Sequence, residues 1–306
     1  MEALRYLPAA LGALILLSLV FLADPAKIYG YIVSSDKLYF ALSVVLYCCG
    51  LVLRSYKWCI ILNLFKQNVS WTKSIFYYSF TTLLGNVTPG RLGEPAIAHV
   101  IRKYENIRIS SFLPLLFFDR LLDFVVIFLY ALFSASIVAS SFFDKISGNI
   151  TAVTYALLLF FLLLCVFWLI ATKSRFKKTF GDILSRAKEG FCKLLNSPRI
   201  FLPIFSLTLL AWLCEFGSMF AILKALGVDI TYIQAVMVSS FGILIGLISM
   251  IPGGQGSAEL SMVAITNQLL LPADKCIAAF VTQRVLNFAI VGVLVAPLYL
   301  IFSRKR

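Results

Sequence analysis

Charge is scarce in this sequence, and the scarcity excludes an ordinary soluble domain. Only 13% of the 306 residues are charged, 61% are hydrophobic, and the mean hydropathy is +0.94. Soluble domains typically carry about 25% charged residues. We therefore expect a single membrane domain over residues 1–306. The net charge of +13 comes without an aromatic-basic motif or zinc-finger spacing, so we expect no nucleic-acid partner.

Histidine and paired cysteine are also scarce, which argues against the usual metal chemistry. His99 is the sole histidine, and the seven cysteines form no C-x-x-C pair. Known metal sites need several such ligands at short spacing. We interpret the cysteines as small buried hydrophobes. No metal, no cofactor and no catalytic residue is expected.

Long apolar runs, by contrast, are plentiful. Runs at 6–23, 38–53, 150–171 and 200–226 are each close to the length of about 20 residues that crosses a bilayer as a helix. Two further spans are expected at 110–140 and 275–301. The sequence thus predicts an all-α polytopic membrane protein with about six spanning helices. The loop at 24–37 is expected on the exterior.

Two interruptions of the apolar sequence resemble each other. They read "NVTPGRLGEP" at 86–95 and "SMIPGGQGSAE" at 249–259. Arg120, in "DRLLDF", lies 31 residues after Pro89, and Arg284, in "QRVLNF", lies 32 residues after Pro252. This spacing favours an internal duplication, with 54–130 as the first repeat and 215–295 as the second.

The basic residues predict the orientation of each repeat in the membrane, because Lys and Arg are enriched in cytoplasmic loops. The stretch after residue 53 has Arg54, Lys57, Lys66 and Lys73, which we place in the cytoplasm. More basic residues follow the first interruption, so 74–104 is predicted to be a re-entrant hairpin open to the cytoplasm. The segment 233–272 has no Lys or Arg and is predicted to be a second hairpin, open to the exterior.

The same charge rule places the rest of the chain. The segment 172–199 mixes Lys and Arg with Phe and Leu and is predicted to be amphipathic, lying along the cytoplasmic surface. Both termini are expected in the cytoplasm of a multi-pass plasma-membrane protein. The result is an inverted repeat, an architecture common in transporters.

The hairpin tips are candidate anion sites. Irregular backbone at membrane depth must line protein or a wet cavity. We expect Pro95 at a first helical position and Ser257 as an N-cap, so that free N–H groups face the cavity and attract an anion such as phosphate. Simple packing kinks remain the alternative. The predicted tip residues are Asn86, Pro89, Gly90, Gly93, Pro252, Gly253, Gly254, Gly256 and Ser257.

The two matched arginines are the sharper indication of a site. Counting along each helix places Arg120 and Arg284 on the order of 14 Å into the bilayer, where a charge is costly and usually functional. Asp123 could neutralise Arg120 as a structural pair. Arg284 has no acid in its own helical window, so it is the better ligand-binding candidate. Glu94 either caps its own hairpin or binds an arginine.

The segments "GNVTPGRLGEPAIAHVIRKY", "FFDRLLDF" and "IPGGQGSAEL" resemble the flippase-like membrane domain of the lysylphosphatidylglycerol synthase family. Bifunctional members join this domain to a soluble aminoacyltransferase, and here the membrane domain is expected to stand alone. The second repeat departs from the first by having Gln283 and Asn287 in place of Asp119 and Asp123. The resemblance implies a lipid-headgroup site made of Arg91, Glu94, Arg120, Asp123, Glu259 and Arg284.

These observations predict a flippase-like transporter. Its partners would be membrane lipids with anionic headgroups: phospholipids, aminoacyl-phospholipids or polyprenyl-phosphate-linked sugars. A membrane-embedded lipid-modifying enzyme and an ion-coupled small-solute transporter are the alternatives. A homodimer and a separate lipid-modifying enzyme remain open as protein partners.

Overall fold

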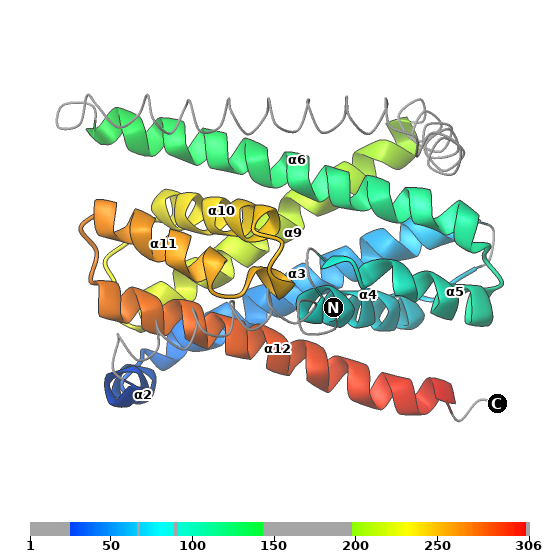
Figure 1. Ribbon diagram of the computed structural model, residues 1–306, viewed down its shortest axis with the longest axis horizontal. Helices are drawn as coiled ribbons and strands as arrows, with labels where there is room; N and C mark the ends of the chain where they lie inside the picture. The colour runs from blue at the N-terminus through cyan, green and yellow to red at the C-terminus, as the bar shows by residue number, and fades with distance from the viewer. Residues whose placement is uncertain (1–24, 66–67, 89–90, 143–197, 304–306) are drawn as a thin grey trace, which may run out of the picture.

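The computed structural model describes residues 25–65, 68–88, 91–142 and 198–303. Every regular element within these ranges is a helix (Figure 1). The spans predicted at 6–23 and 150–171 lie outside the described residues, as does the amphipathic segment up to residue 197. Pro198 and Arg199, which the prediction assigned to that segment, begin a long helix instead.

Four long helices form the frame of the protein. They are α3 (Lys37–Asn63), α6 (Ile109–Phe142), α9 (Pro198–Ala225) and α12 (Ala273–Ser303). Each is long and apolar enough to cross a membrane, which confirms an all-α, multi-pass chain. A shorter helix, α2 (Pro25–Val33), occupies most of the expected loop at 24–37.

Two helical hairpins lie between the long helices. The first consists of α4 (Trp71–Val87), the 3-10 turn η2 (Glu94–Ala96) and α5 (Ile97–Glu105). The second consists of α10 (Tyr232–Ile248), the turn η3 (Pro252–Gly254) and α11 (Ser257–Gln268). The order long helix, hairpin, long helix therefore occurs twice. Its inversion in a membrane stays a prediction.

The start of α11 corrects one detail of the prediction. Gly256 is the N-cap, with a φ of 81°, and Ser257 is the first helical residue. The Gly256 N–H donates to the Glu259 carboxylate at 2.8 Å. Glu259 satisfies this N–H because it projects back from the first turn, so Ser257 is not needed as the cap.

The two halves are interleaved in space. Helices α3 and α9 run antiparallel, with Ser43 hydrogen-bonded to Ser218 and Gly50 close to Ala211. Each hairpin also packs on a long helix of the opposite half: α4 lies against α12, and α10 lies against α6 (Figure 1). Both hairpin tips consequently come together in the middle of the protein.

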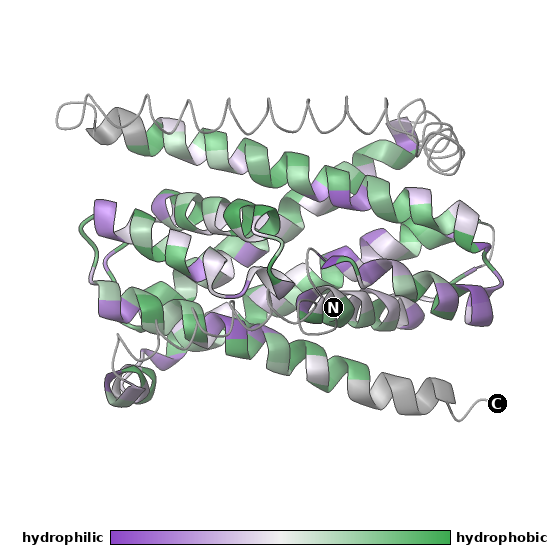
Figure 2. Ribbon diagram, in the orientation of Figure 1, coloured by the Kyte–Doolittle hydropathy of each residue, from purple (hydrophilic) through white to green (hydrophobic). Residues whose placement is uncertain are grey.

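The hydropathy of the surface fits a lipid environment. Large apolar side chains such as Phe117, Phe133 and Val293 are exposed on the long helices. A hydrophilic band interrupts the otherwise hydrophobic α6 part of the way along its length (Figure 2). Asp119, Arg120 and Asp123 belong to this helix, and the two aspartates are buried. The acidic residues of this band are therefore directed into the protein.

Candidate functional site

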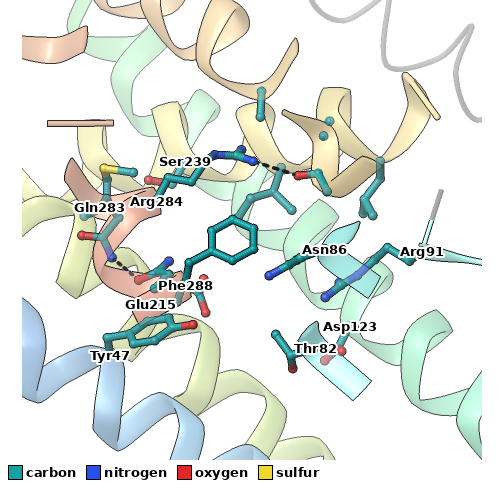
Figure 3. Close-up of a pocket in the computed structure, with 18 of the residues that line it drawn as sticks. Tyr47, Thr82, Asn86, Arg91, Asp123, Glu215, Ser239, Gln283, Arg284 and Phe288 are labelled. Carbon is teal, nitrogen blue, oxygen red and sulfur yellow. Dashed lines mark hydrogen bonds between the residues drawn. The ribbon is translucent and has the colours of Figure 1, made fainter. Parts of the chain in front are cut away.

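A central cavity of about 200 Å³ lies where the hairpin tips meet. Its walls come from α3, α4, α6, α9, α10, α11 and α12. These are all the described α-helices except the short α2 and α5. Figure 3 shows Asn86, Arg91 and Asp123 on one side of this space and Arg284 and Gln283 on the other. Some of the sequence-predicted residues from each half thus line one cavity.

The tips touch directly at Gly253. This residue has a φ of 58°, and a Cβ atom placed on it would lie 2.8 Å from the backbone oxygen of Asn86. Only glycine combines a positive φ with so close a backbone contact. Gly253 therefore lets the second tip rest on the end of α4. Pro89 and Gly90, at the first tip, lie outside the described residues.

Arg120 is surrounded by three carboxylates. Its Nε lies 3.1 Å from Glu94 Oε2, its Nη2 lies 3.1 Å from Asp119 Oδ2, and its Nη1 lies 3.2 Å from Asp123 Oδ2. Glu94 is 3% exposed, and its other oxygen lies 2.8 Å from Arg91 Nε. Of the two roles considered for Glu94, the structure shows the binding of arginines.

Lys57 also belongs to this cluster, although the sequence analysis did not include it among the site residues. Its side chain is fully buried, with Nζ 2.7 Å from Asp119 Oδ1 and 3.1 Å from Asp123 Oδ1. Its assignment to a cytoplasmic basic stretch was wrong, because α3 continues to Asn63 and carries Lys57 inside the protein. The apolar sequence that resumes after Lys57 was the available signal.

Arg284 also has an acidic partner, which comes from outside its own helical window. Glu259 of α11 forms an ion pair with its Nη2, and the Gly253 carbonyl accepts from its Nη1 at 3.3 Å. The acid comes from the hairpin and not from the helix of Arg284. Gln283, the residue before Arg284 on α12, is buried, and its amide donates a hydrogen bond to Ser218 at 2.8 Å.

Arg54 is the second residue that the sequence prediction misplaced. It is 6% exposed, forms an ion pair with Glu215 of α9 and lies over the Trp212 ring, with Cζ 4.3 Å from the ring centroid. Tyr47 lines the cavity beside them. Helices α3 and α9 thus contribute charge to the site, in addition to the hairpins and the helices after them.

The charges of this region balance. Five basic and five acidic side chains are linked by the ion pairs described above, so the described cluster has no net charge. A buried charge requires such pairing, because desolvation is otherwise too costly. The members are Arg54, Lys57, Arg91, Arg120, Arg284, Glu94, Asp119, Asp123, Glu215 and Glu259.

A second cavity of about 260 Å³ adjoins the central one. Its lining is the more apolar of the two, so we call it the apolar cavity and the central one the polar cavity. Leu113, Phe117 and Phe124 of α6 and Leu247 of α10 form much of its wall. Phe117 is 62% exposed, so this cavity borders the outer surface of the protein. Residues that line both cavities are Arg91, Arg120, Asp123, Trp212, Ile243 and Leu247.

Not every predicted site residue lines the polar cavity. Glu94 faces the apolar cavity. Pro252 is buried in the second tip, and Ser257 hydrogen-bonds to Ser249 at 2.8 Å and to the Gly254 carbonyl. In the first tip, the Gly93 N–H donates to Thr88 at 2.8 Å. The predicted residues that do line the polar cavity are Asn86, Arg91, Arg120, Asp123, Gly253, Gly254, Glu259 and Arg284.

Across the described ranges, no group of three or more His, Cys, Asp or Glu side chains is positioned to hold a metal ion. The carboxylates of the cluster instead face arginine and lysine side chains. What the site offers a ligand is a set of guanidinium donors beside apolar walls.

The chain is similar to known membrane proteins over most of its length. Residues 9–296 match the family described as the lysylphosphatidylglycerol synthase TM region. A UPF0104 membrane protein of Methanothermobacter thermautotrophicus is 24% identical over 319 residues, covering 94% of this chain and 91% of the relative. One from Pyrococcus horikoshii is 24% identical over 314 residues, covering 93% of both.

Proposed function

We propose that the chain, which belongs to the family of the lysylphosphatidylglycerol synthase TM region, moves a lipid with an anionic phosphate group between the leaflets of a membrane. Phospholipids, aminoacyl-phospholipids and polyprenyl-phosphate-linked sugars all have this chemistry. The proposal treats the protein as a transporter and assigns it no catalytic residue.

One observation carries the proposal: the polar cavity and the apolar cavity share a wall. Arg91 and Arg120 belong to both, while Phe117 extends the apolar side to the outer surface. A lipid is polar at one end and apolar at the other, so it fits such a pair of spaces. A small hydrophilic solute would make no use of the apolar cavity.

The headgroup would bind at the arginines while its tail stays in the bilayer. Arg91 is well suited to this role, because its side chain is 27% exposed and only its Nε faces Glu94. Guanidinium groups bind phosphate oxygens in pairs. The carboxylates nearby would suit the amino group of a zwitterionic or aminoacylated headgroup.

Alternating exposure of the two hairpins would complete the transfer. We place the first hairpin, 74–104, open to the cytoplasm and the second, 233–272, open to the exterior, with both termini cytoplasmic in the plasma membrane. The contact between Gly253 and Asn86 then separates the two entrances. Movement of one tip relative to the other would expose the cavity to one side at a time.

The test is lipid movement in proteoliposomes. Headgroup-labelled phospholipid and polyprenyl-phosphate probes are reconstituted with the wild-type protein, Arg91→Gln, and Arg102→Gln as an exposed control on α5. We expect movement of at least one probe with wild type and Arg102→Gln, and about tenfold slower movement with Arg91→Gln. Absence of movement for every probe with folded wild-type protein would overturn the proposal.

A further inference from the structure

Arg54 has hydrogen-bonding capacity that the ion pairs leave unused. Its Nη1 faces Glu215, but its Nε and Nη2 are buried and have no acceptor among the described residues. The residue is 6% exposed and lines the polar cavity. A buried N–H without an acceptor destabilises the protein, so this arrangement favours the arrival of an acceptor.

The two unused atoms are on the same edge of the guanidinium group. Nε–H and one Nη2–H point in parallel, at the spacing of two oxygens of a phosphate or a carboxylate. Trp212 covers one face of the guanidinium and Glu215 binds its end, so the orientation of the unused edge is determined. This edge is a fork that is already oriented for a tetrahedral anion.

Two of the other arginines that line the cavity, Arg120 and Arg284, are more fully engaged. Arg120 has a carboxylate oxygen within 3.2 Å of each of Nε, Nη1 and Nη2, although its Nε makes no hydrogen bond with the described residues, and Arg284 directs Nη1 and Nη2 at Gly253 and Glu259. We propose that the Nε and Nη2 edge of Arg54 binds the phosphate group of the ligand inside the polar cavity. That the phosphate belongs to a lipid rests on the proposed function; the site itself does not.

Glu215 has a definite part in this proposal. It holds Arg54 in position, yet its negative charge opposes an incoming phosphate. Removing the charge with Glu215→Gln should leave phosphate binding at least as tight as in the wild type. If the Arg54–Glu215 pair were purely structural, Glu215→Gln would weaken phosphate binding as a change of Arg54 does, because either change would damage the same ion pair.

The experiment measures binding to the purified full chain in detergent by calorimetry, with dihexanoyl phosphatidylglycerol and inorganic phosphate as separate probes. Arg54→Lys keeps the charge and removes the fork. We expect it to weaken binding of the lipid probe at least tenfold, while Arg102→Lys, the same change at an exposed position, leaves the affinity unchanged. Arg54→Gln combined with Glu215→Gln keeps the pair neutral and should abolish binding in a folded protein.

Three outcomes separate the possibilities. Unchanged affinity in folded Arg54→Lys and in the double variant would overturn the site, even if lipid movement persists. Binding that depends on Arg54, without lipid movement by the wild type, would support the site and contradict the proposed function. Binding of inorganic phosphate alone, again dependent on Arg54, would support the fork and assign it to a soluble ligand.

Discussion

Arg284 of α12 is paired with Glu259, an acidic residue in the first turn of α11. Arg120 of α6 is likewise paired with Glu94 in the first hairpin, at 3.1 Å. In both halves, a glutamate just after the helix break fastens the hairpin to the long helix that follows. The two arginines differ in their further partners. Arg120 contacts two more carboxylates, whereas Arg284 donates a hydrogen bond to a backbone carbonyl.

The Glu259–Arg284 pair should contribute strongly to stability. Glu259→Gln removes the charge that compensates Arg284, and losing one partner of a buried pair costs about 3–5 kcal/mol. We expect the lower end of this range, since the Arg284 side chain is 19% exposed. Thermal unfolding in detergent measures the loss.

The matched control for this pair is Glu259→Gln combined with Arg284→Gln. The double variant should recover most of the stability, because no charge is left uncompensated, but it should not recover lipid movement. A single variant as stable as the wild type would show that Arg284 does not depend on Glu259.

Lys57 should matter more for folding than any exposed lysine. Lys57→Met leaves Asp119 and Asp123 without their shared buried cation, and we expect a loss of about 3–5 kcal/mol. Lys37→Met, at the exposed start of α3, is the control and should change stability by less than about 0.5 kcal/mol. Equal effects of the two changes in thermal unfolding would contradict the role of Lys57.

The contact between the hairpin tips should be sensitive to one methyl group. Gly253→Ala adds a Cβ 2.8 Å from the Asn86 oxygen at a position with positive φ, so we expect strain of about 1–3 kcal/mol and slower lipid movement. Gly292→Ala on α12 is the control, since nothing lies within 4 Å of its added Cβ. If both variants move lipid at the wild-type rate, the tips do not need this close contact.

The apolar cavity predicts a difference between two exposed phenylalanines of α6. Phe117 lines that cavity and Phe133 does not, although they are 62% and 59% exposed. In Phe117→Asn, an amide on the path of the tail should slow lipid movement about tenfold, at a cost of about 1–3 kcal/mol. Phe133→Asn should move lipid at the wild-type rate when folded protein is compared in equal amounts.

The sequence was sufficient to predict the elements that depend on local pattern. Apolar runs gave all four described spans, and the Pro-Gly interruptions fall between α4 and α5 and between α10 and α11; that these hairpins are re-entrant stays a prediction. The matched positions of Arg120 and Arg284 also led to residues that do line one cavity. Periodicity and helix-breaking residues act locally, so a sequence pattern is enough to reveal them.

Partners that come from distant segments were not predictable. Arg54 and Lys57 were placed in the cytoplasm because a basic pair beside an apolar run usually marks a membrane boundary. Their acidic partners, Glu215 and Asp119, are on other helices, and Arg284 likewise finds its acid on α11. No spacing along the chain encodes these contacts.

The interleaved packing has a consequence for how the protein is made. Helix α4 packs against α12, which begins at Ala273, so the first hairpin is synthesised long before its neighbour exists. Until then, its polar groups must be sheltered by the translocation machinery or by contacts within the first half. Ordering of the first hairpin therefore becomes a late event of biogenesis, dependent on a helix that leaves the ribosome much later than the hairpin does.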